Sequence, residues 1–482
     1  MWRAILEFLQ GVIYKMLNSN TQITTALQNQ IGALYNISAE MQAAMQEWNA
    51  LYLNQGEHLA DGTKSMNLAK AVSSEIASTA TIEMQVEISG SARAKWLSLQ
   101  MDKLIDDIRQ TIEFGNAKGG LMFKPYVDAS NNLCWDYVQA DMFYPLAFDA
   151  NQNITACVFA EKRKRGAYWY TKFESHQLLT GGQYRIRNFA YRSDSQNYLG
   201  YQIPLASLSE WADLPEEITL ENIIQPLYGY YRVPRANGID PTSPLSVSCF
   251  ADAVDNIKQA DKQYSRLLWE YEGGEMALYV DKSAMEKDAN GNFITKQKRL
   301  HRVLNVAPAS IAEPGFYKEW APALRGSQFI EGLNNILRLV EFNCGLAYGI
   351  LSQENIQTLT ATEIRASRQR YYVTVVDTQK KIRIALNSAL YAADVWASIY
   401  NLAPAGAYNT VYSFDDSIIT DSETAFKQDK EIVDGGGMGW VEFRVRNYGE
   451  TEDLARQKVI EAQAEKRLMS TPPAAGYVQN VT

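Results

Sequence analysis

The spacing of apolar residues divides the chain into regions of different period. From residue 1 to about 115, apolar positions recur every three or four residues, as in AKWLSLQMDKLIDDIRQTIEF, which predicts helices. From residue 121 to about 231 the period changes to two, and aromatic and β-branched residues become frequent. Asn- and Gly-rich stretches such as DASNN, DANQN and TGG separate these runs as turns. The sequence therefore predicts N-terminal helices followed by a meander of short antiparallel strands.

Two amphipathic helices are predicted after this β-rich region. The first opens near Ser246 and ends at Gly273 and Gly274, and the second starts near Ser327. Their apolar stripes are Phe250, Val254, Ile257, Tyr264, Leu268 and Tyr271 in the first helix, and Phe329, Leu333, Ile336, Val340, Cys344 and Ala347 in the second. Between the helices, DANGN separates the runs MALYVDKSAM and FITKQKRLHRVLNV, which predicts a hairpin. Two helices thus flank a small insert.

A polar connection and a very long helix follow. The stretch LSQENIQTLT has few helix signals and is predicted to be a loop, whereas the run from about Ala361 to near Asn401 has no internal proline or glycine. Further on, NYGETEDLARQKVIEAQAEKR predicts a helix capped by Thr451. At the two ends, MWRAILEFLQGVIYKML is expected to be an amphipathic helix rather than a signal peptide, and STPPAAGYVQNVT a flexible tail.

Length and charge narrow the classes of protein. A chain of 482 residues exceeds what one hydrophobic core usually serves, so two or more lobes are expected. The net charge of -9 disfavours a protein that grips nucleic-acid phosphates over a broad basic surface, although a protein past which DNA slides is still allowed. The four cysteines lie far apart without a CxxC pair, which suits reduced thiols. Because no uninterrupted apolar stretch reaches the ~20 residues of a spanning helix, no membrane partner is expected.

Motifs for metal, phosphate or catalytic chemistry are missing from the sequence. The only histidines are His58, His176 and His301, too far apart for an HExxH-type ligand spacing. The glycine-rich pieces GNAKGG and GGGMG lack the GxxxxGK[ST] spacing of a P-loop, and neither a GxSxG elbow nor a kinase signature occurs. We therefore predict no catalytic residue, no metal site and no cofactor, and we expect that the protein is not an enzyme.

Basic side chains are concentrated in three places. The groups are Lys162, Arg163, Lys164 and Arg165 at a strand end; Lys296, Lys298, Arg299 and Arg302 in the insert; and Arg365, Arg368, Arg370, Lys380, Lys381 and Arg383 on the long helix. Each group is either ordinary exposed charge or a contact to phosphates. For the first group, exposed charge is the favoured interpretation.

The order of these parts resembles the portal, or head-to-tail connector, family of tailed phages. The matching stretches include SVSCFADAVDNIKQADKQYSRLLWEYEGGE and RGSQFIEGLNNILRLVEFNCGLAYG for two stem helices. The phrase TLTATEIRASRQRYYVTVVDTQKKIRIAL resembles the tunnel-loop exit and long helix of portals from long-tailed phages of Gram-positive hosts and their relatives. The segment DSETAFKQDKEIVDGGGMGWVEFRVRNYGETEDLARQKVIEA is similar to the crown at the end of the family's chains.

The resemblance implies an α+β, mainly helical portal fold. It divides the chain into a wing (1–244), a first stem helix (245–274), a small α/β clip (275–324), a second stem helix (325–350), a tunnel loop (351–361), a long wing helix with a return segment (362–420), and a crown with a flexible tail (421–482). The tunnel-loop residues that it places beside DNA are Gln353, Glu354, Asn355, Gln357 and Thr358. Arg365, Arg368 and Arg370 are expected to contact either phosphates or acidic groups of the neighbouring subunit, and the basic residues of the insert are expected to dock partners.

The function implied by the resemblance is that of a conduit. Twelve copies would form a ring at one capsid vertex, through which double-stranded DNA is packaged and ejected. The implied partners are the major capsid and scaffolding proteins at the wing, and terminase and later a head-tail adaptor at the clip, first in the host cytoplasm and then in the virion. Two alternatives stay open: a non-viral ring or scaffold protein, and a nucleic-acid-processing enzyme, which the missing motifs disfavour.

Overall fold

The computed structural model describes residues 23–32, 37–275, 277–281, 289, 301–304, 317–320, 322–353, 361–414, 422–448 and 450–470. The chain divides into two compact units, Met1–Phe414 and Asp415–Thr482. With about 48% of residues helical and 21% in strands, the predicted α+β, mainly helical fold class is confirmed. The predicted N-terminal helix over residues 1–17 and the predicted tail after residue 470 lie outside the described residues.

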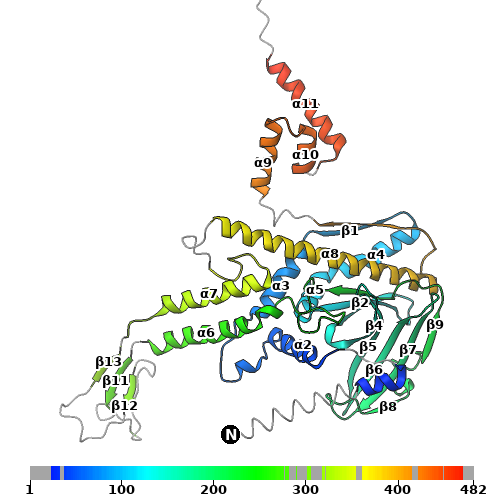
Figure 1. The fold of residues 1–482 in the computed structure, drawn as a ribbon, viewed down its shortest axis with the longest axis horizontal. Coiled ribbons are helices and arrows are strands. Elements are labelled where there is room, and N and C mark those ends of the chain that lie inside the picture. The colour runs from blue at the N-terminus through cyan, green and yellow to red at the C-terminus, as the bar shows by residue number, and fades with distance from the viewer. Residues whose placement is uncertain are drawn as a thin grey trace, which may run out of the picture. The chain divides into compact units, whose positions relative to one another are not determined.

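The predicted β meander forms the largest sheet of the first unit (Figure 1). Its strands are antiparallel and lie in the order β4-β5-β6-β7-β8, with β9 paired to β7. Residues 23–31 are helical, and Leu27 on this helix is buried among Val158, Phe173 and Phe189 of the sheet. The strands are β4 (Phe143–Phe148), β5 (Ile154–Arg165), β6 (Tyr168–Leu178), β7 (Tyr184–Ser193), β8 (Tyr201–Ile203) and β9 (Glu217–Leu220).

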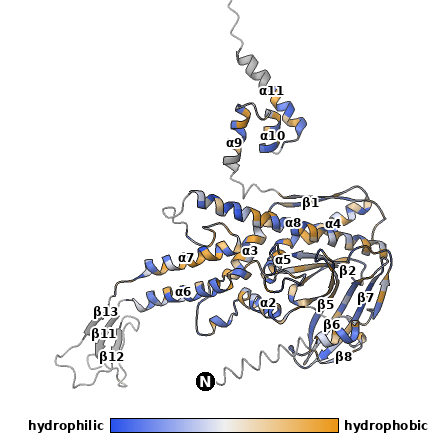
Figure 2. Cartoon of the chain, in the orientation of Figure 1, coloured by the Kyte–Doolittle hydropathy of each residue, from blue (hydrophilic) through white to orange (hydrophobic). Residues whose placement is uncertain are grey.

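A second, three-stranded sheet carries the longest helix of the unit. Its order is β10-β2-β3, formed by β10 (Gly229–Arg232), β2 (Gly120–Val127) and β3 (Leu133–Gln139). Helix α8 (Ala361–Ile399) confirms the long helix predicted from about Ala361 to near Asn401. It contacts β2 and β10 of this sheet. Its C-terminal half is predominantly hydrophobic (Figure 2), and Ala392 packs with Tyr184, Ile186 and Leu227 beside the large sheet.

The N-terminal helices confirm the helical period, but one strand interrupts them. The helices are α2 (Ala39–Tyr52), α3 (Leu68–Thr81), α4 (Ala92–Asp106) and α5 (Ile108–Lys118). Strand β1 (Met84–Ser89), which the sequence analysis missed, pairs antiparallel with β14 (Asn409–Phe414) from the other end of the unit. A short strand whose partner lies so far along the chain has no local turn signal to mark it.

A buried asparagine links the N-terminal helices to the start of the helix pair. The Asn116 side chain donates to the Ser73 carbonyl at 3.2 Å and accepts from the Tyr231 hydroxyl at 2.6 Å. Its backbone carbonyl accepts from the Cys249 amide at 2.9 Å and the Ser248 hydroxyl at 3.3 Å. Because buried polar groups are costly without partners, this network fixes the segment that leads into the helix pair.

The predicted pair of helices is present, and its members lie side by side (Figure 1). They are α6 (Val254–Gly273) and α7 (Gly326–Cys344). The first helix begins at Val254, later than the predicted start near Ser246. The Ser246 hydroxyl does not cap a helix but bonds the carbonyls of Val233 and Arg235, at 2.7 and 2.9 Å.

The predicted stripes on this pair are only partly the buried faces. Phe250 is fully buried but precedes α6, and Tyr271 is 40% exposed. Glu270 and Glu341, which are not part of the predicted apolar stripes, are buried as well. The buried residues are Ile257, Ala260, Asp261, Leu267 and Glu270 on α6, and Gly326, Leu333, Leu337, Val340, Glu341 and Cys344 on α7.

Three short strands separate the two helices in the sequence. They are β11 (Ala277–Asp281), β12 (His301–Leu304) and β13 (Tyr317–Trp320), in the order β12-β11-β13. The predicted hairpin between the first two is wrong, because β11 pairs parallel with β12 and antiparallel with β13. The turn sequence DANGN lies outside the described residues except for residue 289, and strand partners are set by packing that local turn residues do not encode.

The second unit, Asp415–Thr482, is a small group of helices. They are α9 (Ser422–Asp434), α10 (Trp440–Tyr448), which was not predicted, and α11 (Glu452–Ser470), which begins directly after the predicted cap Thr451. The Phe443 ring lies 5.3 Å from that of Phe426 and 5.5 Å from that of Trp440. Hydrogen bonds from Arg444 and Lys458 lower the pKa of Glu450 to about 2, so an ion pair joins α10 to α11.

The contact between β10 and α8 leaves no room for a side chain at Gly229. A Cβ there would overlap the Ala385 carbonyl oxygen and come within 2.9 Å of the Ala389 nitrogen. We expect Gly229→Ala to destabilise the first unit by about 1–3 kcal/mol, because overpacking must push the strand off the helix. Thermal unfolding measures this. Gly238→Ala is the control, since a Cβ at Gly238 meets no described atom within 4 Å; equal losses in the two variants would contradict the prediction.

Candidate functional site

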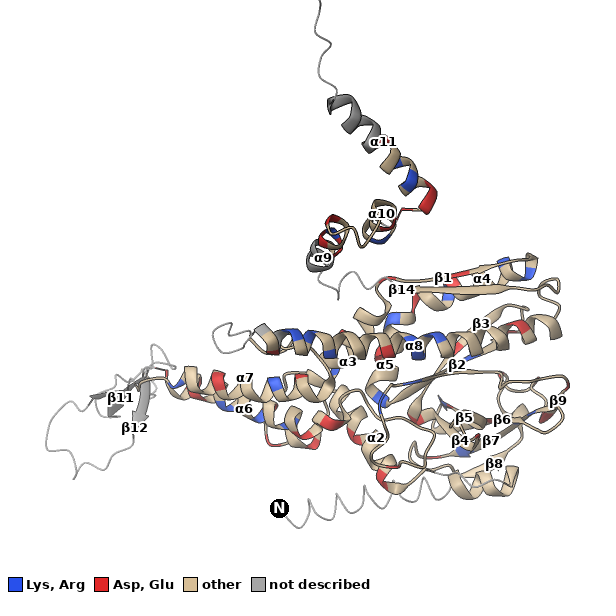
Figure 3. Cartoon of the chain, turned by 45° about the horizontal axis from the view of Figure 1, so that its top comes forward, with Lys and Arg blue, Asp and Glu red and all other residues tan. Residues whose placement is uncertain are grey.

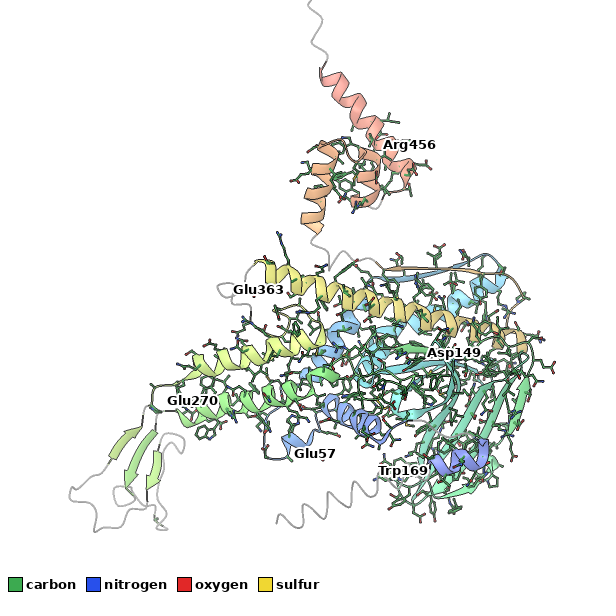
Figure 4. All side chains as sticks on the ribbon, in the orientation of Figure 1. Glu57, Asp149, Trp169, Glu270, Glu363 and Arg456 are labelled. Atoms are coloured by element: carbon green, nitrogen blue, oxygen red, sulfur yellow. The ribbon has the colours of Figure 1, made fainter. Side chains whose placement is uncertain are left out.

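The described residues predicted to contact DNA lie around the connection from α7 to α8 (helices in Figure 4): Gln353 follows α7, and Arg365, Arg368 and Arg370 are on α8. Glu270 lies at the end of α6 next to the three short strands, and Glu363 lies in the first turn of α8. Both belong to the first unit. Two junctions therefore define the site: the end of the pair beside the strands, and the connection from α7 to α8.

At the strand end of the pair, one ion pair joins the two helices. The Arg325 guanidinium donates to both carboxylate oxygens of Glu270, at 3.1 and 2.7 Å, and the Arg325 amide adds a contact at 3.2 Å. The hydrogen bond from the Arg325 side chain lowers the pKa of Glu270. A bidentate arginine–carboxylate pair fixes orientation as well as distance. The insert therefore leaves from two helix ends that are held together.

Nearer the body of the unit, α6 carries a second buried carboxylate. Asp261 is 1% exposed, and its oxygens accept from the Met66 amide at 2.7 Å and lie 2.9 Å from His58 Nε2. The loop between α2 and α3 is thereby tied to α6. His58, considered as a metal ligand in the sequence, binds a helix of the pair instead.

At the other junction, α7 ends in a tight turn against α8. Gly345 has φ of +73°, and the Leu346 amide donates to the Glu341 carbonyl at 2.8 Å. The Thr374 hydroxyl on α8 lies 3.1 Å from the Gly345 carbonyl oxygen. A Cβ at residue 345 would overlap that hydroxyl, so only glycine suits both the left-handed backbone and the contact.

The residues predicted to lie beside DNA are only partly described. Gln353 is exposed, and its amide donates to the Asn334 side chain on α7 at 3.1 Å. Glu354, Asn355, Gln357 and Thr358 lie outside the described residues. The sequence analysis missed Glu341, whose buried carboxylate binds the amides just before this stretch. The only sign of Glu341 in the sequence is that this charged residue directly follows Val340, a position of the predicted apolar stripe.

The three arginines at the start of α8 have different surroundings. Basic residues gather toward the N-terminal half of this helix (Figure 3). Arg365 and Arg368 are exposed. The Arg370 guanidinium lies instead 4.6 Å from the centre of the Phe342 ring and 5.3 Å from that of Tyr348. Arg370 therefore joins α8 to the end of α7, while the other two remain available to ligands.

The other two basic groups contribute little to this site. On β5, Arg163 and Arg165 pair with Glu210, and Lys162 donates to the Gln196 carbonyl at 2.9 Å, which supports exposed charge as the interpretation. In the insert, Lys296, Lys298 and Arg299 lie outside the described residues, and Arg302 is on β12 opposite Tyr279 of β11.

A polar cavity of about 340 Å³ in the β region is neutralised by its own ion pairs. Lys124 lies 3.1 Å from Glu174, and Lys118 lies 2.7 Å from Asp141. Burial raises the pKa of Glu174, but Lys124 and the hydrogen bond from His176 outweigh it, so the pKa stays well below its ordinary value. Burial lowers the pKa of His176, which therefore favours its neutral form. The Lys124–Glu174 pair joins the two sheets, and the Lys118–Asp141 pair joins the end of α5 to the 3-10 turn before β4.

The described part of the chain has neither a cluster of metal-binding side chains nor a helix suited to cross a membrane. No three His, Cys, Asp or Glu side chains in it converge as a metal site would require. Among the helices described there, none combines the length and apolar character needed to cross a membrane.

A known protein family matches most of the chain. The sequence fits the family described as phage portal protein, SPP1 Gp6-like, over residues 12–453. No curated protein matches the chain. The family match covers the helix pair, the insert and α8 in a single alignment.

Arg370 offers a test of the α7–α8 junction. We expect Arg370→Lys to lower the free energy of unfolding by about 1 kcal/mol. The planar guanidinium can stack on the Phe342 and Tyr348 rings, whereas the lysine ammonium is not planar. The midpoint of thermal unfolding measures the loss. Arg368→Lys, on the exposed side of the same helix, is the control and should unfold like the unmodified protein; a similar loss in both variants would argue against a specific role for the rings.

Proposed function

Because the chain belongs to the SPP1 Gp6-like family of phage portal proteins, we propose that it forms the ring through which the genome enters and leaves the capsid. The family match over residues 12–453 is the observation that carries the proposal. Portal proteins are structural components of the virion of tailed phages, and we propose no catalytic role for this chain. The two alternatives, a non-viral scaffold protein and a nucleic-acid enzyme, remain to be excluded by experiment.

We assign the parts of the chain to portal regions on this basis. Helices α6 and α7 would be the stem, residues 275–324 the clip, and 351–361 the tunnel loop. Helix α8 would be the long wing helix, residues 1–244 the wing, and 421–482 the crown and tail. The side-by-side α6 and α7, and the Glu270–Arg325 pair that closes them before the insert, support the stem and clip assignment.

A ring of twelve subunits is the proposed assembly. Trp269 on α6 and Leu339 on α7 are 68% and 51% exposed, which supports burial of these faces against neighbouring subunits. Ring closure uses two different faces of each subunit. At -9 per chain, twelve subunits would carry on the order of a hundred negative charges, which repel phosphates rather than trap them.

Within the channel, we propose that polar rather than basic side chains touch DNA. Gln353, Glu354, Asn355, Gln357 and Thr358 would border the duplex without strong ion pairing, which limits the affinity gained by counterion release. The duplex could then slide past the loop.

The arginines at the start of α8 have a second proposed use. The exposed Arg365 and Arg368 are better placed than Arg370 to bind phosphates or acidic groups of a neighbouring subunit, because Arg370 is engaged by two rings of its own chain. Because a guanidinium binds both phosphates and carboxylates, we propose both kinds of contact for these two arginines.

The proposed partners follow from the same assignment. The major capsid and scaffolding proteins would contact the wing, and terminase and then the head-tail adaptor would dock at the clip. There Lys296, Lys298, Arg299 and Arg302 would meet acidic groups of the partner. Assembly would take place in the host cytoplasm, before the ring becomes part of the virion.

The mass and symmetry of the purified protein test the proposal directly. Native mass spectrometry with negative-stain averaging should give a closed ring of about twelve subunits of 54.3 kDa, with an axial hole that admits a duplex of about 20 Å. A monomer with nuclease or ATPase activity would replace the portal by an enzyme. A monomer that also failed to form rings with its capsid and scaffolding proteins would contradict the proposal.

The tunnel-loop role has its own test. Deleting four of residues 354–360 should reduce the amount of DNA packaged while ring mass and symmetry stay unchanged, because a shorter loop cannot reach the duplex. A Gly-Ser stretch of the original length is the control, since it keeps the reach of the loop and removes its side chains. If the shortened protein packages as well as the unmodified one, the loop does not act on DNA.

A further inference from the structure

A buried carboxylate on α7 holds the chain where it leaves the helix pair. Glu341 is 0% exposed. Its Oε1 accepts from the amides of Gly349, Leu351 and Ser352, at 3.1, 2.6 and 2.9 Å, and its Oε2 accepts from the Ser352 hydroxyl at 2.8 Å. One side chain thus satisfies three backbone donors of an irregular segment.

The same face of α7 holds the next residue of that segment. Asn334 precedes Glu341 by seven residues, about two helical turns, so the two side chains lie on one face. The Asn334 Oδ1 accepts from the Gln353 amide at 3.1 Å. The segment 349–353 therefore runs back along α7, from the level of Glu341 to that of Asn334.

Helix α8 bounds this segment on the other side. The Tyr348 amide lies 3.4 Å from the Ser367 hydroxyl on α8, and Ser367 is 1% exposed. Ser352 is also buried, at 6%. Ser352 is the buried residue of this segment, while Gly349 and Gln353 at its two ends are exposed, so water is excluded from the contact at Ser352.

Hydrogen bonds to Glu341 fix the backbone of this segment at three residues. Ile350 and Leu351 add half-buried apolar side chains, whereas Gly349 and Ser352 bring little apolar surface. A buried carboxylate is tolerated only where donors satisfy it, and those donors are in turn fixed by it. The carboxylate and the amides thus require each other.

We infer that Glu341 is a positioning residue for DNA passage, which fixes the point and direction at which the chain enters the loop 351–361. The inference rests on the proposed channel role of that loop. Glu341 itself is buried and would not touch DNA. It would act by holding residues 349–353, so that each copy of the loop begins at the same place in the ring.

Amide hydrogen exchange on the assembled protein tests the anchor. In Glu341→Gln, the side chain keeps its size, but the three amides meet a neutral carbonyl oxygen in place of a charged carboxylate oxygen, and the NH₂ replaces the oxygen that accepts from the Ser352 hydroxyl. Exchange at Gly349, Leu351 and Ser352 should then be roughly tenfold faster, because hydrogen bonds to a charged acceptor are stronger than those to a neutral one. Glu331→Gln, at an exposed position of the same helix, is the control and should exchange as the unmodified protein does. Unchanged exchange in Glu341→Gln would overturn the anchor.

A milder variant keeps the test usable if Glu341→Gln does not form rings. Asn334→Ala removes only the acceptor of the Gln353 amide, and faster exchange confined to that amide would support the same path along α7. Unchanged exchange there would count against it.

Packaging separates the anchor from the channel role. With rings of normal mass, Glu341→Gln should package less DNA than Glu331→Gln. If Glu341→Gln loosens the segment and packages normally, while the four-residue deletion blocks packaging, the positioning inference fails and the loop role stands. If the deletion also packages normally, the proposed channel role itself fails.

Discussion

A buried carboxylate must find donors, and this constraint organises the helix pair of the first unit. Asp261 on α6 and Glu341 on α7 are almost completely buried, and each binds backbone amides of a segment outside the pair. Glu270 binds the amide and the guanidinium of Arg325, where the insert ends and α7 begins. Since an unsatisfied buried charge is strongly destabilising, each segment can occupy only the position that supplies the donors.

This arrangement suits a subunit that must be rigid where it meets its neighbours and adaptable where it meets DNA. The buried carboxylates fix the ends of irregular segments, and aromatic contacts to Arg370 and the Gly345–Thr374 approach fix α8 against α7. Under the proposed function, the polar residues that follow Gln353 in the sequence would contact DNA. Function at the loop would therefore depend on buried residues that never meet DNA.

The sequence predicted the parts of the fold whose information is local. Helices α7 and α8 carry long uninterrupted patterns, and their starts were predicted closely. Pairings over long distances were missed: β1 finds its partner in β14, and β11 pairs parallel with β12. At the site, the arginines were identified by type, but nothing in the pattern separated Arg370 from Arg368, or marked Glu341 as buried. Those distinctions arise only when α7 and α8 meet.

The pairing of β1 with β14 has a consequence for synthesis of the chain. Residues 84–89 leave the ribosome early, but their partner is the segment 409–414, which is made after the helix pair and α8. At about 5–20 residues per second, the first strand waits tens of seconds for its partner. Until then its edge is open to other chains. Translation itself thus sets the earliest moment at which a subunit can close its fold and join others.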